Sequence, residues 1–197
     1  MIPPIWERMN SSRLTLDEFQ SWFSDAWSKA DSRVLKLECW QSYQEIDAGG
    51  SQEAFDRGDI ATARNLLRQE AEADRPLYED IRDRGIEYAR IRLVQEPVTS
   101  YLKYELIAYE IRAAMGENIE VVRFDPALRL PSEDHFDFLL FDRHTALIHD
   151  YGSGDSGLQT GGWLTHSMDV ITSLEQAALK LRRNAVPLLR YLAESQQ

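Results

Sequence analysis

Three polar side chains within one apolar segment have the types and spacing of a catalytic motif. The segment EDHFDFLLFD, residues 133–142, contains His135, Asp137 and Asp142 in the pattern H-x-D-x-x-x-x-D. A histidine can act as a nucleophile or a general acid, and a nearby carboxylate can orient it. If the chain is an enzyme, His135 and Asp142 are therefore the predicted catalytic residues.

With one change the pattern resembles the H-x-K-x-x-x-x-D motif of phospholipase D-type phosphodiesterases. In those enzymes the lysine supplies positive charge to a phosphate group in the transition state. Asp137 would place a negative charge there instead, and the chain has a single altered copy where two copies normally form one site. The segment is therefore interpreted as a buried strand, as a degenerate ligand-binding relative of that fold, or as the site of a small hydrolase.

The same segment also offers a metal site. Side chains alternate along a strand, so His135 and Asp137 should share a face. A turn at Arg143-His144 would place Asp137 across from Asp150 in a β-hairpin. Two opposed carboxylates repel each other unless a cation or a shared proton separates them. His135, Asp137 and Asp150 are thus the predicted metal ligands, and solvated charges at the end of a hairpin are the alternative.

A further set of polar residues lies in the segment QEPVTSYLKYEL. Glu96 ends a predicted strand, and Tyr101 and Glu105 are one turn apart on the helix that follows. The C-terminal ends of parallel strands are where α/β proteins bind ligands. Glu96, Tyr101 and Glu105 are therefore the predicted ligand-binding residues. The alternative is a structural hydrogen-bond network with Arg90 or Arg92.

The glycine-rich run after the hairpin is not predicted to bind a nucleotide. GSGDSG, residues 152–157, matches G-x-G-x-x-G, but it does not join a first strand directly to a helix within a βαβ unit. The sequence therefore predicts no cofactor. Residues 152–162 contain five glycines and little apolar surface, so they are predicted to form a mobile lid over the ligand end of the sheet.

Helical patterns dominate the first half of the chain. LTLDEFQSWFSDAW has apolar residues at helical spacing, and Thr15 is the expected N-cap. Residues 34–43 fit either a strand or a helix. Residues 60–85 are polar and helix-forming, with Pro76 expected to start a new helix and Gly85 to end it.

The second half alternates between strands and helices. Strand 88–94, helix 99–115 and strand 119–124 form a βαβ unit, so the two strands should be parallel. The hairpin follows, and then a long C-terminal helix from about Ser167 that is interrupted or kinked near Pro187.

These elements predict one mixed α/β (α+β) domain over residues 1–197. A mostly helical region, 1–86, should pack on a mixed sheet formed within 87–197 by the βαβ unit and the C-terminal hairpin. The long C-terminal helix should close the structure.

Composition limits the partners and the compartment. The formal net charge is −11, with 33 acidic and 22 basic side chains, which argues against direct nucleic-acid binding. Cys39 is the only cysteine and is expected to be buried in an apolar run, so no disulfide forms within the chain. No apolar segment is long enough for a membrane span, and no signal peptide is recognised, so a cytoplasmic location is expected.

Several segments resemble an uncharacterised domain family that is widespread in actinobacteria, often encoded beside helix-turn-helix regulators. The segments are VLKLECWQSY, RIRLVQEPVTSYLKYEL, Gly116 to Ile119, FDFLLFD and AVPLLRYL, and the resemblance covers about residues 14 to 192. It implies a regulatory accessory and transfers no catalytic residue.

The expected function is therefore that of a non-enzymatic regulatory or ligand-sensing protein. It would act with a protein partner, such as a helix-turn-helix regulator, and would bind a small molecule. The alternative is the small phosphodiesterase-like hydrolase with the degenerate H-x-D-x-x-x-x-D site.

Overall fold

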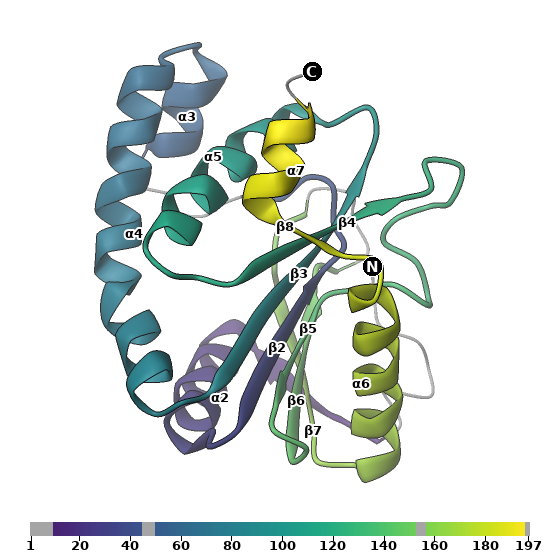
Figure 1. Cartoon of the computed structure of the whole chain (residues 1–197). Helices are drawn as coiled ribbons and strands as arrows, with labels where there is room; N and C mark the ends of the chain where they lie inside the picture. Colours follow the sequence, from purple (N-terminus) through teal and green to yellow (C-terminus); the bar gives the residue numbers. More distant parts are fainter. Residues whose placement is uncertain (1–9, 45–49, 153–156, 196–197) are drawn as a thin grey trace.

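The computed structural model describes residues 10–44, 50–152 and 157–195, and in these ranges the chain forms one eight-stranded sheet and six helices (Figure 1). The strands are β1 (Ser12–Thr15), β2 (Arg33–Glu38), β3 (Glu87–Gln95), β4 (Ile119–Phe124), β5 (Phe138–Phe141), β6 (Thr145–Asp150), β7 (Gly161–Thr165) and β8 (Val186–Pro187). The helices are α2 (Leu16–Lys29), α3 (Ser51–Asp56), α4 (Ile60–Asp83), α5 (Ser100–Ala114), α6 (Met168–Arg182) and α7 (Leu188–Ser195).

The sheet is mixed, as predicted. Its order is β1-β7-β6-β5-β2-β3-β4-β8, in which β2, β3 and β4 are parallel and the other pairs are antiparallel. The βαβ unit β3-α5-β4 and the hairpin β5-β6 are both confirmed. The run after residue 34, which fitted a strand or a helix, begins with a strand, because β2 lies inside the sheet between β5 and β3.

Helices cover both faces of the sheet (Figure 1). The α6 helix packs on one face, where Ile171 and Leu174 join Leu35 and Ile91 in the largest apolar cluster. The other face is covered by α2 and the end of α4 at one side, and by α5 and α7 at the other. The N-terminal region is thus more than a helical layer, because it also supplies strands β1 and β2.

The predicted helix ends are confirmed where a capping residue carries the signal. The Thr15 side chain accepts from the backbone N–H of Glu18 at 3.3 Å, and the Glu18 carboxylate accepts from the Thr15 N–H at 2.8 Å. This reciprocal capping box starts α2. Gly85 and Gly116 follow α4 and α5 with φ values of 68° and 108°, which an L side chain rarely adopts.

Of the two proline predictions, the one for Pro76 was wrong and the one for Pro187 is confirmed as an interruption. Pro76 lies inside one continuous α4 helix, because Leu67, Ala71 and Ile81 on both sides of it bury the same stripe. Pro187 interrupts the C-terminal helical run, which is divided into α6, ending at Arg182, and α7, beginning at Leu188. It lies in the edge strand β8, opposite Glu120 of β4, where a missing N–H donor is tolerated.

The predicted lid is only partly described, since residues 153–156 lie outside the ranges given above. Its last two glycines, Gly161 and Gly162, belong to β7 and pair with β1 and β6, so this end of the segment is part of the sheet. A Cβ atom on Gly162 would lie 2.3 Å from the Phe19 ring and 2.6 Å from the Ile148 carbonyl oxygen. Close packing therefore accounts for Gly162, whereas the sequence suggested conformational freedom.

Candidate functional site

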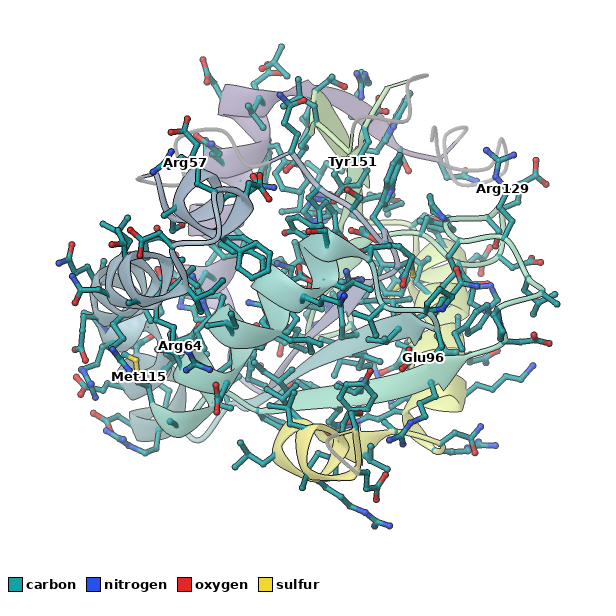
Figure 2. All side chains as sticks on the ribbon, turned by 90° about the horizontal axis from the view of Figure 1, so that it is seen from above. Arg57, Arg64, Glu96, Met115, Arg129 and Tyr151 are labelled. Atoms are coloured by element: carbon teal, nitrogen blue, oxygen red, sulfur yellow. The ribbon has the colours of Figure 1, made fainter. Side chains whose placement is uncertain are left out.

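A polar pocket of about 330 Å³ lies over the sheet, between the loop after β2 and the helices α4 and α5. Five tyrosines line it, Tyr43, Tyr101, Tyr104, Tyr109 and Tyr151. Its charged side chains are Lys36, Glu38, Glu70, Arg90, Glu105, Arg112 and Asp137, and His149 is also part of the wall. In Figure 2 the labelled Tyr151 lies among side chains of the interior, above the ribbons of the sheet.

Alternation along two apolar strands brings the charges to the pocket. Lys36 and Glu38 of β2 point to the α5 side, while Leu35 and Leu37, which alternate with them, pack under α6. Arg90 and Arg92 of β3 do the same. Charged residues two apart within an otherwise apolar strand are the signal that could have identified this surface from the sequence.

Glu38 is the centre of one ionic network. Its carboxylate contacts Lys36 Nζ at 2.7 Å and Arg90 Nη1 at 2.8 Å, and it accepts a hydrogen bond from the Tyr109 hydroxyl. Burial alone would raise the pKa of Glu38, but the positive charges of Arg90 and Lys36 hold it well below the ordinary value. Glu38 is therefore ionised and fully paired.

Arg92 is the centre of a second network and has no exposed surface. Its Nε donates to Glu105 Oε2 at 2.8 Å, and its Nη atoms donate to the backbone carbonyl groups of Glu38 and Trp40. Burial raises the pKa of Glu105 to about 7, against the lowering effect of Arg92, and the charge of Glu38 raises it further. Glu105 thus titrates near neutral pH, while Glu38 does not.

Asp137 is held by three donors in the floor of the pocket. It accepts from the Cys39 N–H at 2.6 Å, from the Tyr151 hydroxyl at 2.8 Å and from the Tyr43 hydroxyl. Burial raises the pKa of Asp137 even though these hydrogen bonds favour its charged form. Cys39 is fully buried, as predicted, and burial raises the pKa of its thiol well above the ordinary value.

His149 differs from the other polar residues of the pocket wall. Within the described part of the chain, neither ring nitrogen of His149 has a hydrogen-bond partner, and both are buried. Its ring centroid is 4.8 Å from that of Phe19 and lies nearly parallel to the Tyr151 ring. Burial lowers the pKa of His149 to about 3, and although Gln159 is close enough to raise that pKa in part, its geometry is not that of a hydrogen bond. The imidazole is therefore neutral.

The predicted ligand-binding residues are divided between two places. Tyr101 and Glu105 line the pocket, and the Tyr101 hydroxyl donates to Glu105 at 3.3 Å. Glu105 also forms the structural ion pair with Arg92 that was the alternative interpretation. Glu96 is exposed and accepts from the Tyr191 hydroxyl at 3.3 Å, well apart from Tyr151 in Figure 2.

The predicted metal ligands are not brought together. The β5-β6 register places Asp137 opposite His149, because the turn contains three residues and not two. Asp150 therefore faces the α6 side of the sheet, where it forms an ion pair with Arg13. His135 is half-buried, and its ring packs against Phe124 with centroids 4.7 Å apart. Within the described ranges, no three His, Cys, Asp or Glu side chains are grouped as metal ligands would be.

The predicted catalytic pair lies at the two ends of β5. His135 precedes the strand and contacts Ser132, whereas Asp142 follows it in the turn. The Asp142 carboxylate accepts from the backbone N–H groups of Asp31, Ser32 and Arg33 at 3.1, 2.9 and 2.8 Å, and from the Ser32 hydroxyl. Asp142 has a φ of 51° and joins the hairpin turn to the start of β2.

Replacing Asp142 with alanine is expected to lower the free energy of unfolding by about 2–3 kcal/mol, because three backbone donors lose their acceptor. Asp142→Asn should lose less, since asparagine tolerates a positive φ and keeps one acceptor oxygen. Burial acts to raise the pKa of Asp142, but hydrogen bonds from Ser32 and the backbone hold this pKa below its ordinary value. Its stabilisation is therefore present above the unfolded pKa and is lost as the pH falls through the folded one. Urea unfolding at pH 7 and pH 3 measures both effects, and equal stability of the three proteins would contradict them.

The fold and the pocket define a mixed α/β protein with a tyrosine-lined polar pocket. Residues 18–193 match the family described as a domain of unknown function, DUF6879. The chain belongs to this family, since the match covers most of its length. Comparison with curated proteins gave no match. Within the described residues, no helix is both long and apolar enough to cross a membrane.

Proposed function

We propose that the protein is a non-enzymatic ligand-sensing protein that binds a small polar molecule in the pocket and acts with a protein partner. The observation that carries this proposal is the pocket itself. Its volume of about 330 Å³ falls in the range of small-molecule sites, roughly 300–1,000 Å³. Hydrogen bonds and ion pairs already fix Glu38, Asp137 and Tyr151, so a ligand would meet a preformed surface.

A small hydrolase acting at the same pocket is the second candidate. It is favoured by one observation, the pKa of about 7 at Glu105, which suits a general acid or base at neutral pH. The sensing role is preferred because Glu105 is bound to Arg92, and because both Asp137 oxygens are engaged by donors. Turnover of any phosphodiester or ester substrate that is abolished by Glu105→Gln would reverse this preference.

The ligand-binding role can be tested by filling the pocket. A low-molecular-mass extract of the native host is expected to raise the Tm of the wild-type protein by several degrees, because a bound ligand stabilises the folded state. Ala108 lines the pocket from α5, and Ala108→Leu should abolish this rise. Ala114→Leu is the matched control, since Ala114 is exposed on the same helix and should leave the rise intact. A rise that persists in Ala108→Leu would place the ligand elsewhere.

The regulatory part of the proposal requires a protein partner. Trp22, Leu128 and Leu189 are large apolar side chains that are 37%, 53% and 58% exposed. The centres of interfaces are more apolar than the rest of the protein surface, and tryptophan is enriched there. The resemblance to proteins encoded beside helix-turn-helix regulators suggests a regulator as the partner. Affinity purification of the tagged protein from its native host should recover that regulator. Recovery of the protein alone, at low salt and with the extract present, would contradict a partner-dependent role.

A further inference from the structure

Most tyrosine hydroxyl groups of the pocket donate into the protein and not into the cavity, whereas that of Tyr104 shares a hydrogen bond with the Ser51 hydroxyl in which either oxygen can donate. Four of them have a buried carboxylate as acceptor: Tyr43 and Tyr151 donate to Asp137, Tyr101 donates to Glu105, and Tyr109 donates to Glu38. A phenol has a single O–H donor. These tyrosines therefore offer an occupant only acceptor oxygens and ring faces, and the rings of Tyr109 and Tyr43 already have the guanidinium groups of Arg90 and Arg92 over one face.

The positive charges in the wall are already compensated. Each is paired with a carboxylate: Lys36 and Arg90 with Glu38, Arg90 also with Glu117, and Arg112 with Asp74. Glu117 and Asp74 are not among the pocket-lining residues and add two negative charges behind the wall, where Arg92, paired with Glu105, adds one positive charge. The lining itself carries four carboxyl groups, those of Glu38, Glu70, Glu105 and Asp137, against three basic side chains. The pocket thus has an excess of acceptors and of negative charge.

Among the described residues, His149 adds an unpaired acceptor to the wall of the pocket, independently of the carboxyl groups. Its ring nitrogens are buried without a hydrogen-bond partner in the described part of the protein, although buried polar groups are nearly always paired. The neutral ring lines the cavity beside Tyr151 and Gln159. Both nitrogens are covered by neighbouring side chains, so an N–H or O–H group of an occupant would reach one of them only after a small side-chain movement, and it would pair the acceptor nitrogen alone.

We infer that the pocket binds a small organic cation, a compound whose ammonium or amidinium group lies against Glu105 and the surrounding tyrosines. This inference rests on the proposed ligand-binding function. The N–H donors of such a group would meet the carboxylate of Glu105 in charge-assisted hydrogen bonds. Its charge would lie over the faces of tyrosine rings such as Tyr101 and Tyr104, where a cation is attracted to the ring.

The inference is tested by separating the native-host extract by charge at pH 7. The probes are the fraction retained by a cation exchanger, the fraction retained by an anion exchanger and the fraction retained by neither, each added to the wild-type protein during thermal unfolding. Only the cation-exchange fraction is expected to raise the Tm. That rise should fall by at least half in Glu105→Gln, which keeps an acceptor for Arg92 but removes the charge.

The anion-exchange fraction is included as a probe because Lys36 has N–H donors beyond the one that contacts Glu38, and these could bind an anion. A rise produced by the anion-exchange or neutral fraction would overturn the cation inference and leave the ligand-binding function standing. If the unfractionated extract gives no rise, the proposed function fails, and the inference fails with it. The Ala114→Leu protein is the folding control, and circular dichroism establishes that Glu105→Gln is folded before it is compared.

Proton release gives a second readout that a merely structural role for Glu105 would not change. A cation that binds beside Glu105 displaces the proton of its carboxyl group. The other groups that face this carboxyl are Arg92 of β3, Glu38 of β2, and Tyr101 and Tyr109 of α5. The measured quantity is the dilution of the cation-exchange fraction at which the Tm rise falls to half. Because Glu105 titrates near pH 7 in the free protein, binding should be tighter at pH 8, and this dilution should be about tenfold greater at pH 8 than at pH 6. No shift with pH would overturn the assignment to Glu105.

Discussion

Replacing Arg92 with methionine is expected to lower the free energy of unfolding by about 3–5 kcal/mol. The Arg92 side chain has no exposed surface, and it holds Glu105 together with two backbone carbonyl groups. Methionine fills much of the same volume but leaves the carboxyl of Glu105 without its positive partner in a buried site. The cost therefore comes from the group left behind more than from the lost contact.

Urea unfolding measures this loss, and two further variants identify its cause. Lys29→Met removes a surface ion pair with Asp25, whose side chains are 71% and 41% exposed, and should cost no more than about 1 kcal/mol. Arg92→Met combined with Glu105→Leu removes both charges and should recover most of the stability lost by Arg92→Met alone. A double variant no more stable than Arg92→Met would show that the loss comes from packing or from the carbonyl groups of Glu38 and Trp40, which lose their donor in both variants.

The fold was easier to predict from the sequence than the site. Capping box, βαβ unit and hairpin are local patterns of 4 to 40 residues, and the side chains that specify them are close in the sequence. The pairing of β2 with β5 joins Leu37 to Phe138, about 100 residues away, and no local pattern encodes it. From the sequence alone, residues 34–43 therefore fit either a strand or a helix, although the run is clearly apolar.

The site depends on such distant pairings. Tyr101 and Glu105 could be predicted because they lie one turn apart on a helix that follows a strand. Their neighbours Glu38 and Asp137 reach the pocket only through the order of strands in the sheet. A one-residue error in the β5-β6 turn moved Asp150 to the wrong face, since side chains alternate with a period of two. The metal prediction was built on that error.

The stability of Glu105→Gln relative to the wild type is expected to increase by about 2–3 kcal/mol between pH 5 and pH 8. In the folded protein, burial raises the pKa of Glu105 to about 7 from a model-peptide value of 4.5. Between these two values the folded state holds a proton that the unfolded state has lost. The wild type therefore becomes less stable as the pH rises through this window, and glutamine has no proton to lose.

The comparison of two proteins is needed because other groups titrate in the same range. Burial lowers the pKa of His149 to about 3, so neutral His149 stabilises both proteins increasingly up to about pH 6.5. That contribution has the opposite sign to that of Glu105, so the wild-type curve alone would be nearly flat. It cancels in the difference between the variant and the wild type, which isolates Glu105.

Chemical unfolding at half-unit pH intervals measures this difference. Glu110→Gln is the matched control, because Glu110 is on the same helix but is 43% exposed and paired at the surface with Arg64. Its stability relative to the wild type should stay constant across the range, since solvent screens an exposed pair. If the stability of Glu105→Gln relative to the wild type is also constant between pH 5 and pH 8, then Arg92 keeps Glu105 ionised throughout this range. Neither the proton release on cation binding nor the hydrolase alternative would then have its titrating group.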